Sequence, residues 1–579
     1  MPVIATAGHV DHGKSTLIEA LTGRNPDRLA EEKQRGMTID LGFAWTTLAS
    51  GRAVGFVDVP GHQRFIANML AGVGSVSSAL LVVAADEGWK PQTEEHLAAL
   101  DLLGIHRVAV GLTKSDLTEE VESAVERVRE HLVGTLAASA PIVPVSARTG
   151  EGLDALRQVL DELTVDAIDA DRPSLWIDRV FTVKGAGTVV TGTLTGGSLS
   201  VGQELASWPG NRQARVRTIE SHEQRIDRAP PGSRVGVNLV GAHHSDLARG
   251  TRLALPGALR ATSRFHGTFR RARYVDQLRE RGAYQIHVGT ATVAATLRKM
   301  GADHVLVQLA SPLWLEAGDR YLLRDAGRHL VVGGGLVLDP APQGRGSEIS
   351  GRSQALSDAW AGGRDRLATV LLETRGMANR ADLTAWSGGG LPSGVGDGDV
   401  VSDERAAQLV EAAQDVVESY HREHPLEAGM TVGGLAKAMG LDEGLTRLIA
   451  GKSSELVLDG ATVARVGAGA ASVDPAWELV AAHLRTAAPP TLDELAVPLE
   501  VLRRLIRDGR VVRVADNLVY LPEVLQEVVA RARSLGKPFT VSEFRQLIGV
   551  SRKHAVPLLE HFDREGTTIR QGNQRTLRS

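Results

Sequence analysis

The chain of 579 residues contains no cysteine. This excludes disulfide bonds, thiolate metal ligands and a cysteine nucleophile, and it is typical of a cytosolic protein. Long apolar runs are also missing, since the longest aliphatic stretch covers only residues 79–85 and is far too short to cross a membrane. The first residues lack a charged segment before an apolar one, so no signal peptide is expected. Because the formal net charge is only −4, any nucleic-acid site must be local.

The length of the chain and the changes in its hydrophobic period predict several domains. In residues 1–171, short apolar runs rich in valine and isoleucine alternate with segments of helical period. This pattern is typical of a largely parallel sheet covered by helices. Beyond Arg172 the period becomes two and glycine turns are frequent, which predicts two β-barrels, at 172–259 and 260–345.

The rest of the chain is expected to form tandem α/β winged-helix domains. Short helices alternate with turns, and the later segments repeat a helix, a helix-turn-helix pair and a short hairpin. The predicted boundaries are 346–424, 425–470, 471–522 and 523–579. The expected fold class is therefore multidomain, with an α/β domain, two barrels and tandem winged helices.

The stretch GHVDHGKS at residues 8–15 fits the G-x-x-x-x-G-K-[ST] pattern of P-loops, which bind phosphates. It follows a predicted strand and precedes a predicted helix, which is the context that the pattern requires. Backbone N–H groups at such a helix start cradle phosphates. Lys14 would reach the β- and γ-phosphates, and Ser15 would offer a hydroxyl to Mg²⁺. The alternative, a glycine turn with an incidental lysine, is disfavoured by this context.

Three further loops, each at the end of a predicted strand, indicate a guanine nucleotide. In DVPG, Asp58 can hold Mg²⁺ through water and the N–H of Gly61 can contact the γ-phosphate. In TKSD, Asp116 can accept hydrogen bonds from N1–H and N2–H₂ of guanine, which adenine lacks, and Lys114 would lie over the base. The stretch SAR at 146–148 would offer a backbone N–H to O6. Loops at the carboxyl ends of parallel strands meet where open α/β sheets bind ligands.

Two residues near these motifs are candidates for the switch and for hydrolysis. Thr38, in RGMT, would reach Mg²⁺ only when a γ-phosphate is present, and would so order its loop in the GTP state. His62 directly follows DVPG and can position the attacking water. An isolated histidine would be interpreted as a surface residue, but its place in the motif favours catalysis.

The motifs GHVDHGKS, RGMT and DVPGH resemble those of translational GTPases of the elongation factor Tu type, which use histidine where Ras-like proteins use glutamine. The resemblance implies that Val10 and Met37 form an apolar gate around His62 and that Asp11 lies close to the phosphates. Thr113 departs from the pattern, because the guanine loop usually begins with an asparagine that braces the phosphate loop, so nucleotide affinity is expected to be altered. The residues assigned to GTP are Asp11, His12, Gly13, Lys14, Ser15, Thr16, Gly61, Thr113, Lys114, Asp116, Ser146, Ala147 and Arg148, and those assigned to Mg²⁺ are Ser15, Thr38 and Asp58.

The chain continues for about 230 residues beyond the predicted barrels, unlike elongation factor Tu. Over its whole length it resembles the SelB family of bacterial selenocysteine-specific elongation factors, most strongly at 1–120, 176–194 and 542–566. This resemblance implies a ribosome-stimulated GTPase that converts GTP to GDP and phosphate. It would carry selenocysteinyl-tRNA to UGA codons marked by an mRNA hairpin, the SECIS element. The implied cofactors are GTP/GDP and Mg²⁺, the implied partners are the tRNA, the hairpin and the ribosome, and a cytoplasmic monomer without membrane contact is expected.

A carrier of this kind must distinguish selenocysteine from serine on the same tRNA. A selenol is more acidic than a thiol, whose pKa is about 8.5, so selenocysteine would be an anion at neutral pH and a cationic pocket could select it. The resemblance points to Asp178 and Arg179 in WIDRVF and to Arg234 in PPGSRVG. The two arginines would hold the selenolate, and Asp178 would orient one of them or bind the aminoacyl ammonium group. An ordinary salt bridge on a strand is the alternative.

The last predicted domain is locally basic. From Leu525 onward there are ten basic and five acidic residues, and positive charge at a helix start and on a wing suits phosphate contacts. A stem-loop offers both splayed bases and a backbone to such a domain. A winged helix can equally bind DNA or protein, and a charged face can simply be solvated, so only the resemblance favours RNA. The expected contacts are Arg545, Arg552, Lys553, Arg570 and Arg575.

Other function classes remain as alternatives at this point. One is a general aminoacyl-tRNA carrier with an unrelated winged-helix extension. Another is a GTP-regulated DNA-binding or scaffold protein, which the two barrels disfavour because they suit a tRNA acceptor arm. A P-loop kinase is disfavoured by the guanine loop TKSD.

Overall fold

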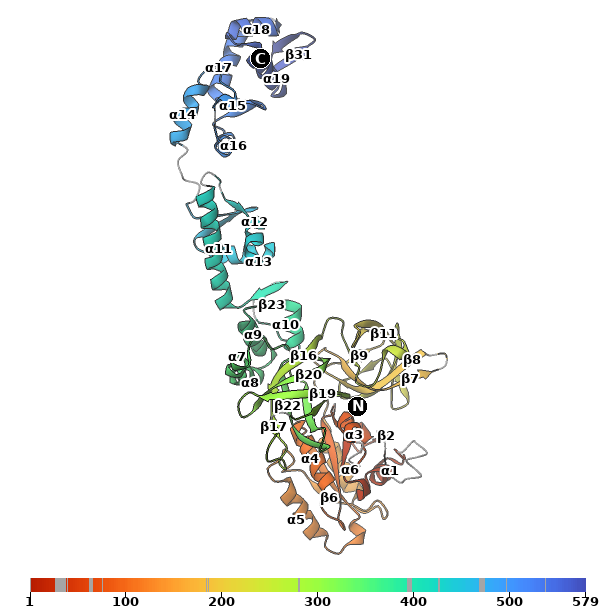
Figure 1. Ribbon diagram of the computed structural model, residues 1–579. Helices are drawn as coiled ribbons and strands as arrows, with labels where there is room; N and C mark the ends of the chain where they lie inside the picture. Colours follow the sequence, from red (N-terminus) through yellow and green to blue (C-terminus); the bar gives the residue numbers. More distant parts are fainter. Residues whose placement is uncertain are drawn as a thin grey trace. The chain divides into compact units, whose positions relative to one another are not determined.

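The computed structural model describes residues 2–26, 38, 40–61, 66–74, 76–183, 185, 187–279, 282–392, 398–424, 427, 429–467, 474–495, 497–536 and 538–578. The chain divides into two compact units, Met1–Ser402 and Asp403–Ser579. In Figure 1 the first unit runs from red through green and the second is coloured blue-green to blue. Within the described residues, no helix is long and apolar enough to cross a membrane.

The first unit begins with a mainly parallel sheet in the strand order β2-β3-β1-β4-β5-β6. Only the pairing of β2 with β3 is antiparallel among these strands. The central strands are buried along their whole length, which explains their uninterrupted apolar sequences. The strands are β1 (Val3–Gly8), β2 (Gly42–Thr47), β3 (Ala53–Asp58), β4 (Ser78–Ala84), β5 (Arg107–Thr113) and β6 (Ile142–Pro144).

Helices cover both faces of this sheet. The core on one face is formed with α1 and α6, and the core on the other face with α3, α4 and α5. Helix α1 starts after Gly13 and ends at Gly23, both in the left-handed conformation that glycine adopts without strain. The helices are α1 (Lys14–Thr22), α3 (Ile66–Val73), α4 (Pro91–Leu102), α5 (Val121–Leu132) and α6 (Leu153–Leu163), with short 3₁₀ turns η1 (Val10–His12) and η3 (Ser115–Leu117).

The sheet domain is followed by a closed barrel. Its strands pair in the order β10-β15-β7-β8-β14-β11, and β10 pairs with β11 to close the ring. Strand β11 buries alternate residues, as its period of two predicts. The strands are β7 (Ser174–Val183), β8 (Gly187–Thr195), β9 (Leu199–Ser200), β10 (Glu204–Trp208), β11 (Arg212–Ser221), β12 (Gln224–Ile226), β13 (Arg228–Ala229), β14 (Arg234–Val240) and β15 (Arg252–Ala254), with the turn η4 (His244–Asp246).

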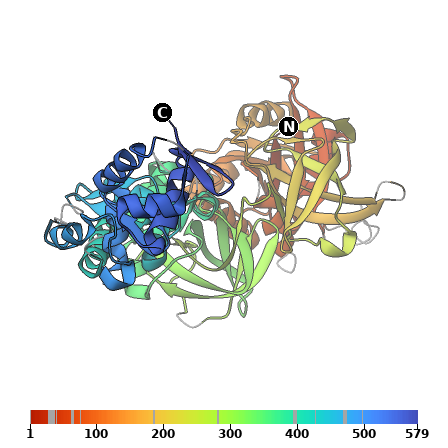
Figure 2. The same ribbon diagram turned by 90° about the horizontal axis from the view of Figure 1, so that it is seen from above.

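A second barrel closes in the order β16-β20-β19-β18-β21-β22, with β22 paired back to β16. Figure 2 shows the two barrels as separate sets of strands, yellow and green. The apolar core of the second barrel is continuous with the α4 side of the sheet domain, so these domains pack as one body. The strands are β16 (Arg260–Thr268), β17 (Arg270–Arg271), β18 (Tyr284–Val288), β19 (Ala291–Lys299), β20 (His304–Leu315), β21 (Arg320–Asp325) and β22 (Leu330–Asp339).

The first winged helix also belongs to the first unit. It shares a core with the second barrel, in which Ala317 and Leu338 pack with Leu356 and Leu371. Arg375 is buried and pairs with Asp339 of the barrel at 2.6 Å. The elements are α7 (Gly346–Gly351), α8 (Ser353–Ala361), α9 (Arg364–Arg375), β23 (Met377–Asn379), α10 (Arg380–Trp386) and β24 (Asp399–Val401).

The second unit starts with α11 (Asp403–Glu423), which the sequence assigned to the first winged helix. This assignment needs correction, because α11 packs against α12, α13 and β27 of the next domain. The division of the chain therefore falls at Ser402 and not at residue 424. The remaining elements of this domain are β25 (Met430–Thr431), α12 (Val432–Met439), α13 (Glu443–Lys452), β26 (Leu456–Asp459) and β27 (Thr462–Arg465).

The last two winged helices share one apolar core, which runs from Val480 to Phe562. In the final domain, Thr540 and Glu543 form a capping box that starts α18. The elements are α14 (Asp474–Leu484), α15 (Leu492–Leu495), α16 (Leu499–Arg507), β28 (Val512–Ala515), β29 (Leu518–Tyr520), α17 (Pro522–Arg533), β30 (Phe539–Thr540), α18 (Val541–Ile548), α19 (Arg552–Arg564), β31 (Thr568–Gln571) and β32 (Gln574–Leu577).

Candidate nucleotide site and the adjoining pocket

The predicted phosphate loop connects β1 to α1. Gly8 has a φ of +127°, and an added Cβ would lie 2.2 Å from the carbonyl oxygen of Val82, so only glycine fits there. Lys14 is 3% exposed, and its Nζ donates to the carbonyl oxygens of Gly8 at 3.2 Å and His9 at 2.8 Å. A Cβ on Gly61 would lie 2.5 Å from that Nζ. The loop after β3 therefore packs directly against the lysine that is expected to bind phosphate.

The three oxygen-bearing side chains assigned to Mg²⁺ lie together. The hydroxyl of Ser15 donates to Asp58 at 2.6 Å, and its oxygen lies 2.9 Å from the hydroxyl oxygen of Thr38. Thr6 donates to the other carboxylate oxygen of Asp58 at 2.7 Å. Burial raises the pKa of Asp58, while the nearby Lys14 opposes this. Two hydroxyls and one carboxylate are hard oxygen donors, so this set fits Mg²⁺.

The residues assigned to guanine meet at the neighbouring strand ends. Asp116 pairs with Arg148 at 2.8 Å, and hydrogen bonds from Ser146 and Arg148 lower the pKa of Asp116, which favours the carboxylate that guanine needs. Lys114 pairs with Glu87 at 2.7 Å. Ala147 lies between Ser146 and Arg148 in the same turn.

Thr113 joins this region to the phosphate loop. Its hydroxyl donates to the carbonyl oxygen of His12 at 2.7 Å, and it also reaches the carbonyl oxygen of Val83 at 3.3 Å. His12 is buried, and burial lowers its pKa to about 4, so its ring is neutral. The threonine thus braces the phosphate loop in place of the asparagine of related loops.

Other sequence-assigned residues differ in how far they can be placed. Asp11 and Thr16 are exposed on the loop and on α1. Val10 is described and lies against Gly61. His62 and Met37 lie outside the described residues, so the apolar gate and the water-positioning role remain predictions.

His96 on α4 was missed by the sequence analysis. It is buried, and its Nδ1 accepts a hydrogen bond from the backbone N–H of Gly8 at 2.9 Å. Burial lowers its pKa to about 3, which keeps the ring neutral and able to accept. The signal was hidden because a histidine on a helix carries no pattern that points to a loop 88 residues away.

The residues assigned to selenocysteine lie on the first barrel, next to the sheet domain. The pairing of β7 with β8 shifts register between Ile177 and Arg179, which places Asp178 in a β-bulge. Asp178 is buried. Its carboxylate accepts hydrogen bonds from both terminal nitrogens of Arg234, one of them at 3.2 Å, and from the hydroxyl of Thr191 at 2.6 Å. Burial acts to raise the pKa of Asp178, but Arg234, then Thr191 and Arg179, lower it below its usual value. Asp178 therefore orients an arginine.

Arg179 faces the sheet domain. Its Nη2 donates to the carboxylate of Asp40 at 2.7 Å and to the carbonyl oxygen of Leu41 at 2.6 Å. The guanidinium carbons of Arg179 and Arg234 lie 5.0 Å and 3.5 Å from the centre of the Phe43 ring. Asp40 carried no motif in the sequence analysis and was not identified there.

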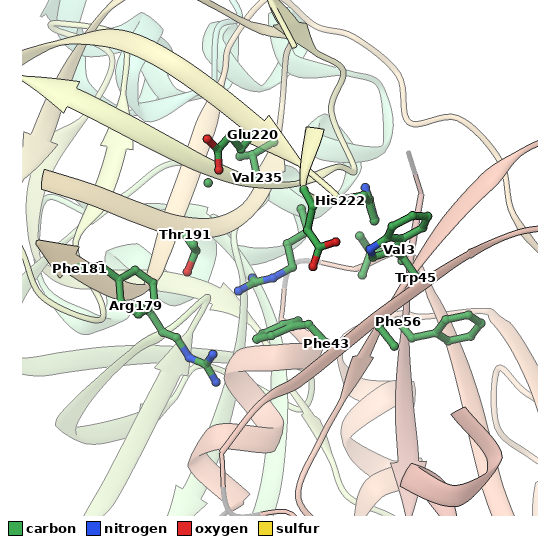
Figure 3. Close-up of a pocket in the computed structure, with 15 residues that line it drawn as sticks. Val3, Phe43, Trp45, Phe56, Arg179, Phe181, Thr191, Glu220, His222 and Val235 are labelled. Atoms are coloured by element: carbon green, nitrogen blue, oxygen red, sulfur yellow. The ribbon is translucent and has the colours of Figure 1, made fainter. Parts of the chain in front are cut away.

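Arg179, Arg234 and Phe43 line a cavity of about 250 Å³ between the first barrel and strands β2 and β3. Figure 3 shows Arg179 and Thr191 on the barrel side and Phe43 and Trp45 on the sheet side. Glu220, His222 and Glu223 also line it. A cavity that contains two arginines and several aromatic rings suits an anionic group attached to a larger body.

The basic residues assigned to RNA are placed unequally on the last winged helix. Arg545, Arg552 and Arg570 are exposed on α18, α19 and β31. Lys553 is exposed as well and lies 3.8 Å from Glu494 of the preceding domain. Arg575 must be removed from the contact set, because its side chain is only 5% exposed and pairs with Asp563 at 2.9 Å.

Comparisons with known proteins agree with this architecture. A family model of the elongation factor Tu GTP binding domain matches residues 1–166. A model of the beta-barrel domain of selenocysteine-specific elongation factor matches 268–344, and one of the elongation factor SelB winged helix matches 531–577.

Full-length relatives carry the same assignment. Selenocysteine-specific elongation factors of Desulfomicrobium baculatum and Escherichia coli (strain K12) are 33% and 35% identical to the chain, over all of its length and 100% and 98% of theirs. A crystal structure of a bacterial selenocysteine-specific elongation factor matches with a TM-score of 0.78 and 26% identity, and both chains are covered completely. Since the likeness includes the winged helices as well as the GTPase domain and barrels, the chain is a translational GTPase that belongs to the family of selenocysteine-specific elongation factors.

Proposed function

We propose that the chain, with GTP bound, carries selenocysteinyl-tRNA to the ribosome in the cytoplasm and recognises the amino acid by its charge. The observation that supports this is the pair of arginines, Arg179 and Arg234, at the cavity between the barrel and the GTPase domain. Selenocysteine at neutral pH presents an anion, whereas serine presents a neutral hydroxyl. The cavity is larger than either side chain needs, so the sugar and base at the end of the tRNA can share it.

The two arginines have different roles in this proposal. Arg234 gives both terminal nitrogens to Asp178, so its orientation is set before any ligand arrives. Nη1 and Nε of Arg179 have no hydrogen-bond acceptor among the described residues. Arg179 is therefore the arginine that donates to the selenolate, and Arg234 adds a fixed positive charge beside it. Charge-assisted hydrogen bonds of this kind are stronger than neutral ones.

The nucleotide roles follow from the oxygen cluster and the loops around it. Ser15, Thr38 and Asp58 would hold Mg²⁺, which would neutralise charge on the β- and γ-phosphates. Lys14 would bind the same phosphates, and Asp116 would read guanine. His62 is proposed to position the attacking water on the evidence of its motif alone.

The last winged helix is proposed to read the mRNA hairpin that marks a UGA codon. Its exposed cations Arg545, Arg552, Lys553 and Arg570 are the proposed contacts. Lys553 shares its charge with Glu494, but an exposed pair of this kind contributes little and can exchange for a phosphate.

The decisive test is binding of the GTP-loaded protein to one tRNA charged with selenocysteine or with serine, beside an ordinary elongator aminoacyl-tRNA. Strong preference for the selenocysteinyl form is the expected result. Equal binding of the three would contradict charge recognition and would favour a general carrier. Binding of selenoprotein mRNA hairpins, with their loop intact or replaced, then tests RNA recognition by the last winged helix. The salt dependence of the affinity measures the phosphate contacts.

A further inference from the structure

The segment that contains Thr38 contacts both functional sites. At one end, the Thr38 hydroxyl oxygen lies 2.9 Å from that of Ser15 and 3.4 Å from Asp58, within the set assigned to Mg²⁺. Two residues later, Asp40 and Leu41 accept hydrogen bonds from Arg179. Two residues of chain span at most about 7 Å, so Thr38 cannot move further than this from Asp40 unless Asp40 moves as well.

One wall of the cavity comes from strand β2, which begins directly after this segment. Phe43 lies only three residues after Asp40, and its ring contacts both pocket arginines. Leu41 is buried in the core that includes Val59 and Leu70, so the chain directly after Asp40 is fixed to the sheet domain. The pocket is thus built by the barrel on one side and by strands β1, β2 and β3 on the other, and β2 directly continues the Thr38 segment (Figure 3).

A further arginine of the barrel, Arg249, contacts helix α3, which follows the DVPGH motif of the nucleotide site. Arg249 donates to the side chain of Asn68 on α3 at 2.7 Å. Arg249 also interacts electrostatically with Asp40 and Asp178. Barrel arginines therefore hold both segments that flank the γ-phosphate position.

We propose that Asp40 is a positioning residue, which holds Arg179 in its selenolate-binding orientation only while Thr38 is docked at the GTP site. Without the γ-phosphate Thr38 leaves Ser15 and Asp58, Arg179 loses Asp40 as an acceptor, and the amino-acid pocket loosens. This inference rests on the proposed function, because it assumes that Arg179 binds the selenolate.

The pairing of the pocket arginines bears on how strong this link is. Asp40 pairs with Arg179 and Asp178 pairs with Arg234, so each arginine has a carboxylate partner before the ligand binds. When Asp40 leaves, Arg179 can turn toward solvent or toward Asp178, and it must then be ordered again by the ligand. Coupling between two sites typically changes affinity by roughly 5- to 150-fold, and it acts equally in both directions.

The experiment measures dissociation constants of selenocysteinyl-tRNA for the full chain, once with a non-hydrolysable GTP analogue and once with GDP. The quantity of interest is the ratio of the GDP constant to the analogue constant. For Asp40→Ala we expect this ratio to fall at least about fivefold, and Asp40→Glu should restore most of it. The double variant Asp40→Ala/Arg179→Ala should show no further loss beyond Arg179→Ala, since both remove one link.

A reciprocal readout separates positioning from a general loss of structure. Selenocysteinyl-tRNA should slow release of the GTP analogue from the native protein, and this slowing should be lost in Asp40→Ala. As a matched control, Arg270→Ala breaks another arginine–aspartate pair between a barrel and the GTPase domain, that with Asp101 at 2.9 Å, and should keep both effects.

Three results would count against the inference or the function on which it rests, and they are distinguishable. If the native protein prefers selenocysteinyl-tRNA over seryl-tRNA while Asp40→Ala keeps the full ratio and the slowed release, Asp40 does not position Arg179. If the native protein shows no such preference, the proposed function fails first. A folded Asp40→Ala protein with equal loss in the Arg270→Ala control would also reject a specific link.

Discussion

The hydroxyl of Thr113 supports the phosphate loop through the carbonyl oxygen of His12, and it does so from a buried position. The sequence alone indicated only that an asparagine was missing there. A threonine side chain is shorter than that of asparagine, and its hydroxyl has only one proton to donate. It therefore makes one hydrogen bond to this loop. Nucleotide affinity should therefore depend strongly on this single hydrogen bond.

Thr113→Val keeps the shape of the side chain and removes the hydroxyl. It leaves the carbonyl of His12 without this donor, which should cost about 1–2 kcal/mol and weaken GTP and GDP binding about tenfold. Fluorescent nucleotide titration measures the effect, and Thr113→Ser is the matched control that retains the hydroxyl. Unchanged affinity in the valine variant would show that the brace is dispensable.

Alanine variants of the two pocket arginines should have different effects. Arg179→Ala should lose the preference for selenocysteinyl- over seryl-tRNA and keep GTP binding, because Arg179 is not among the residues assigned to the nucleotide. Its free energy of unfolding should change little, because its partner Asp40 is partly exposed. Arg234→Ala should lose the same preference and also lower the free energy of unfolding by about 3 kcal/mol, since Asp178 would be left buried and unpaired. Binding assays and thermal unfolding distinguish them; equal stability of the two variants would contradict this assignment.

His62→Ala tests the hydrolysis step. The variant should bind GTP and selenocysteinyl-tRNA normally, and it should hydrolyse GTP on programmed ribosomes at least about 100-fold more slowly. Single-turnover hydrolysis is the measurement. A normal rate would transfer the water-positioning role to another residue.

The wing of the last domain shows why charge in a sequence does not by itself locate a nucleic-acid contact. Arg575 on β32 pairs with Asp563 of α19, and Thr568 of β31 donates to the same carboxylate at 2.5 Å. This aspartate thus ties both strands of the wing to the recognition-type helix. Because the guanidinium of Arg575 is buried and paired with Asp563, it orients the wing and is poorly accessible to a phosphate.

Arg575→Ala should therefore act on stability first. Removing the guanidinium from this largely buried pair should lower the stability of the C-terminal core by roughly 2–3 kcal/mol. By contrast, Arg570→Ala, on the exposed face of the neighbouring strand, should weaken hairpin binding, reduce its salt dependence and leave unfolding unchanged. Chemical denaturation and filter binding separate the two. The reverse assignment of effects would restore Arg575 as a contact.

At the element scale, the period of the sequence predicted what repeats along the chain. The sheet, the two barrels and the helix–hairpin repeats follow from spacing within short windows. Helix α11 was assigned to the wrong domain because its apolar face fits either neighbour, and only packing decides between them. The bulge at Asp178 and the partners of Arg179 were equally hidden, since both depend on contacts across the sheet and between domains.

Across the whole molecule, neutral buried histidines gather in the first unit. Burial lowers their pKa to about 4, or to about 3 in one case; they are His12, His96, His222, His266 and His287. An unfolded histidine titrates near pH 6.5. Below that value the unfolded chain binds protons that the folded chain does not, so the free energy of unfolding falls as the pH falls toward about 4.

Thermal unfolding from about pH 7 to about pH 5 should show this difference. The transition of residues 1–402 is identified by its upward shift when GDP is added, and its midpoint should fall more steeply with acidification than that of residues 403–579. Equal slopes for the two transitions would show that the buried histidines do not set the acid sensitivity.

The continuous core of the last two winged helices limits how a gene of this kind can be rearranged. A recombination break between β29 and α17 would expose Tyr520 and Leu525 together with the apolar residues around them. Exposed apolar surface costs about 25 cal/mol per Å², so neither half would be expected to survive alone. These two domains must be inherited, exchanged or lost together, whereas a break near residue 402 leaves each product with a complete interior.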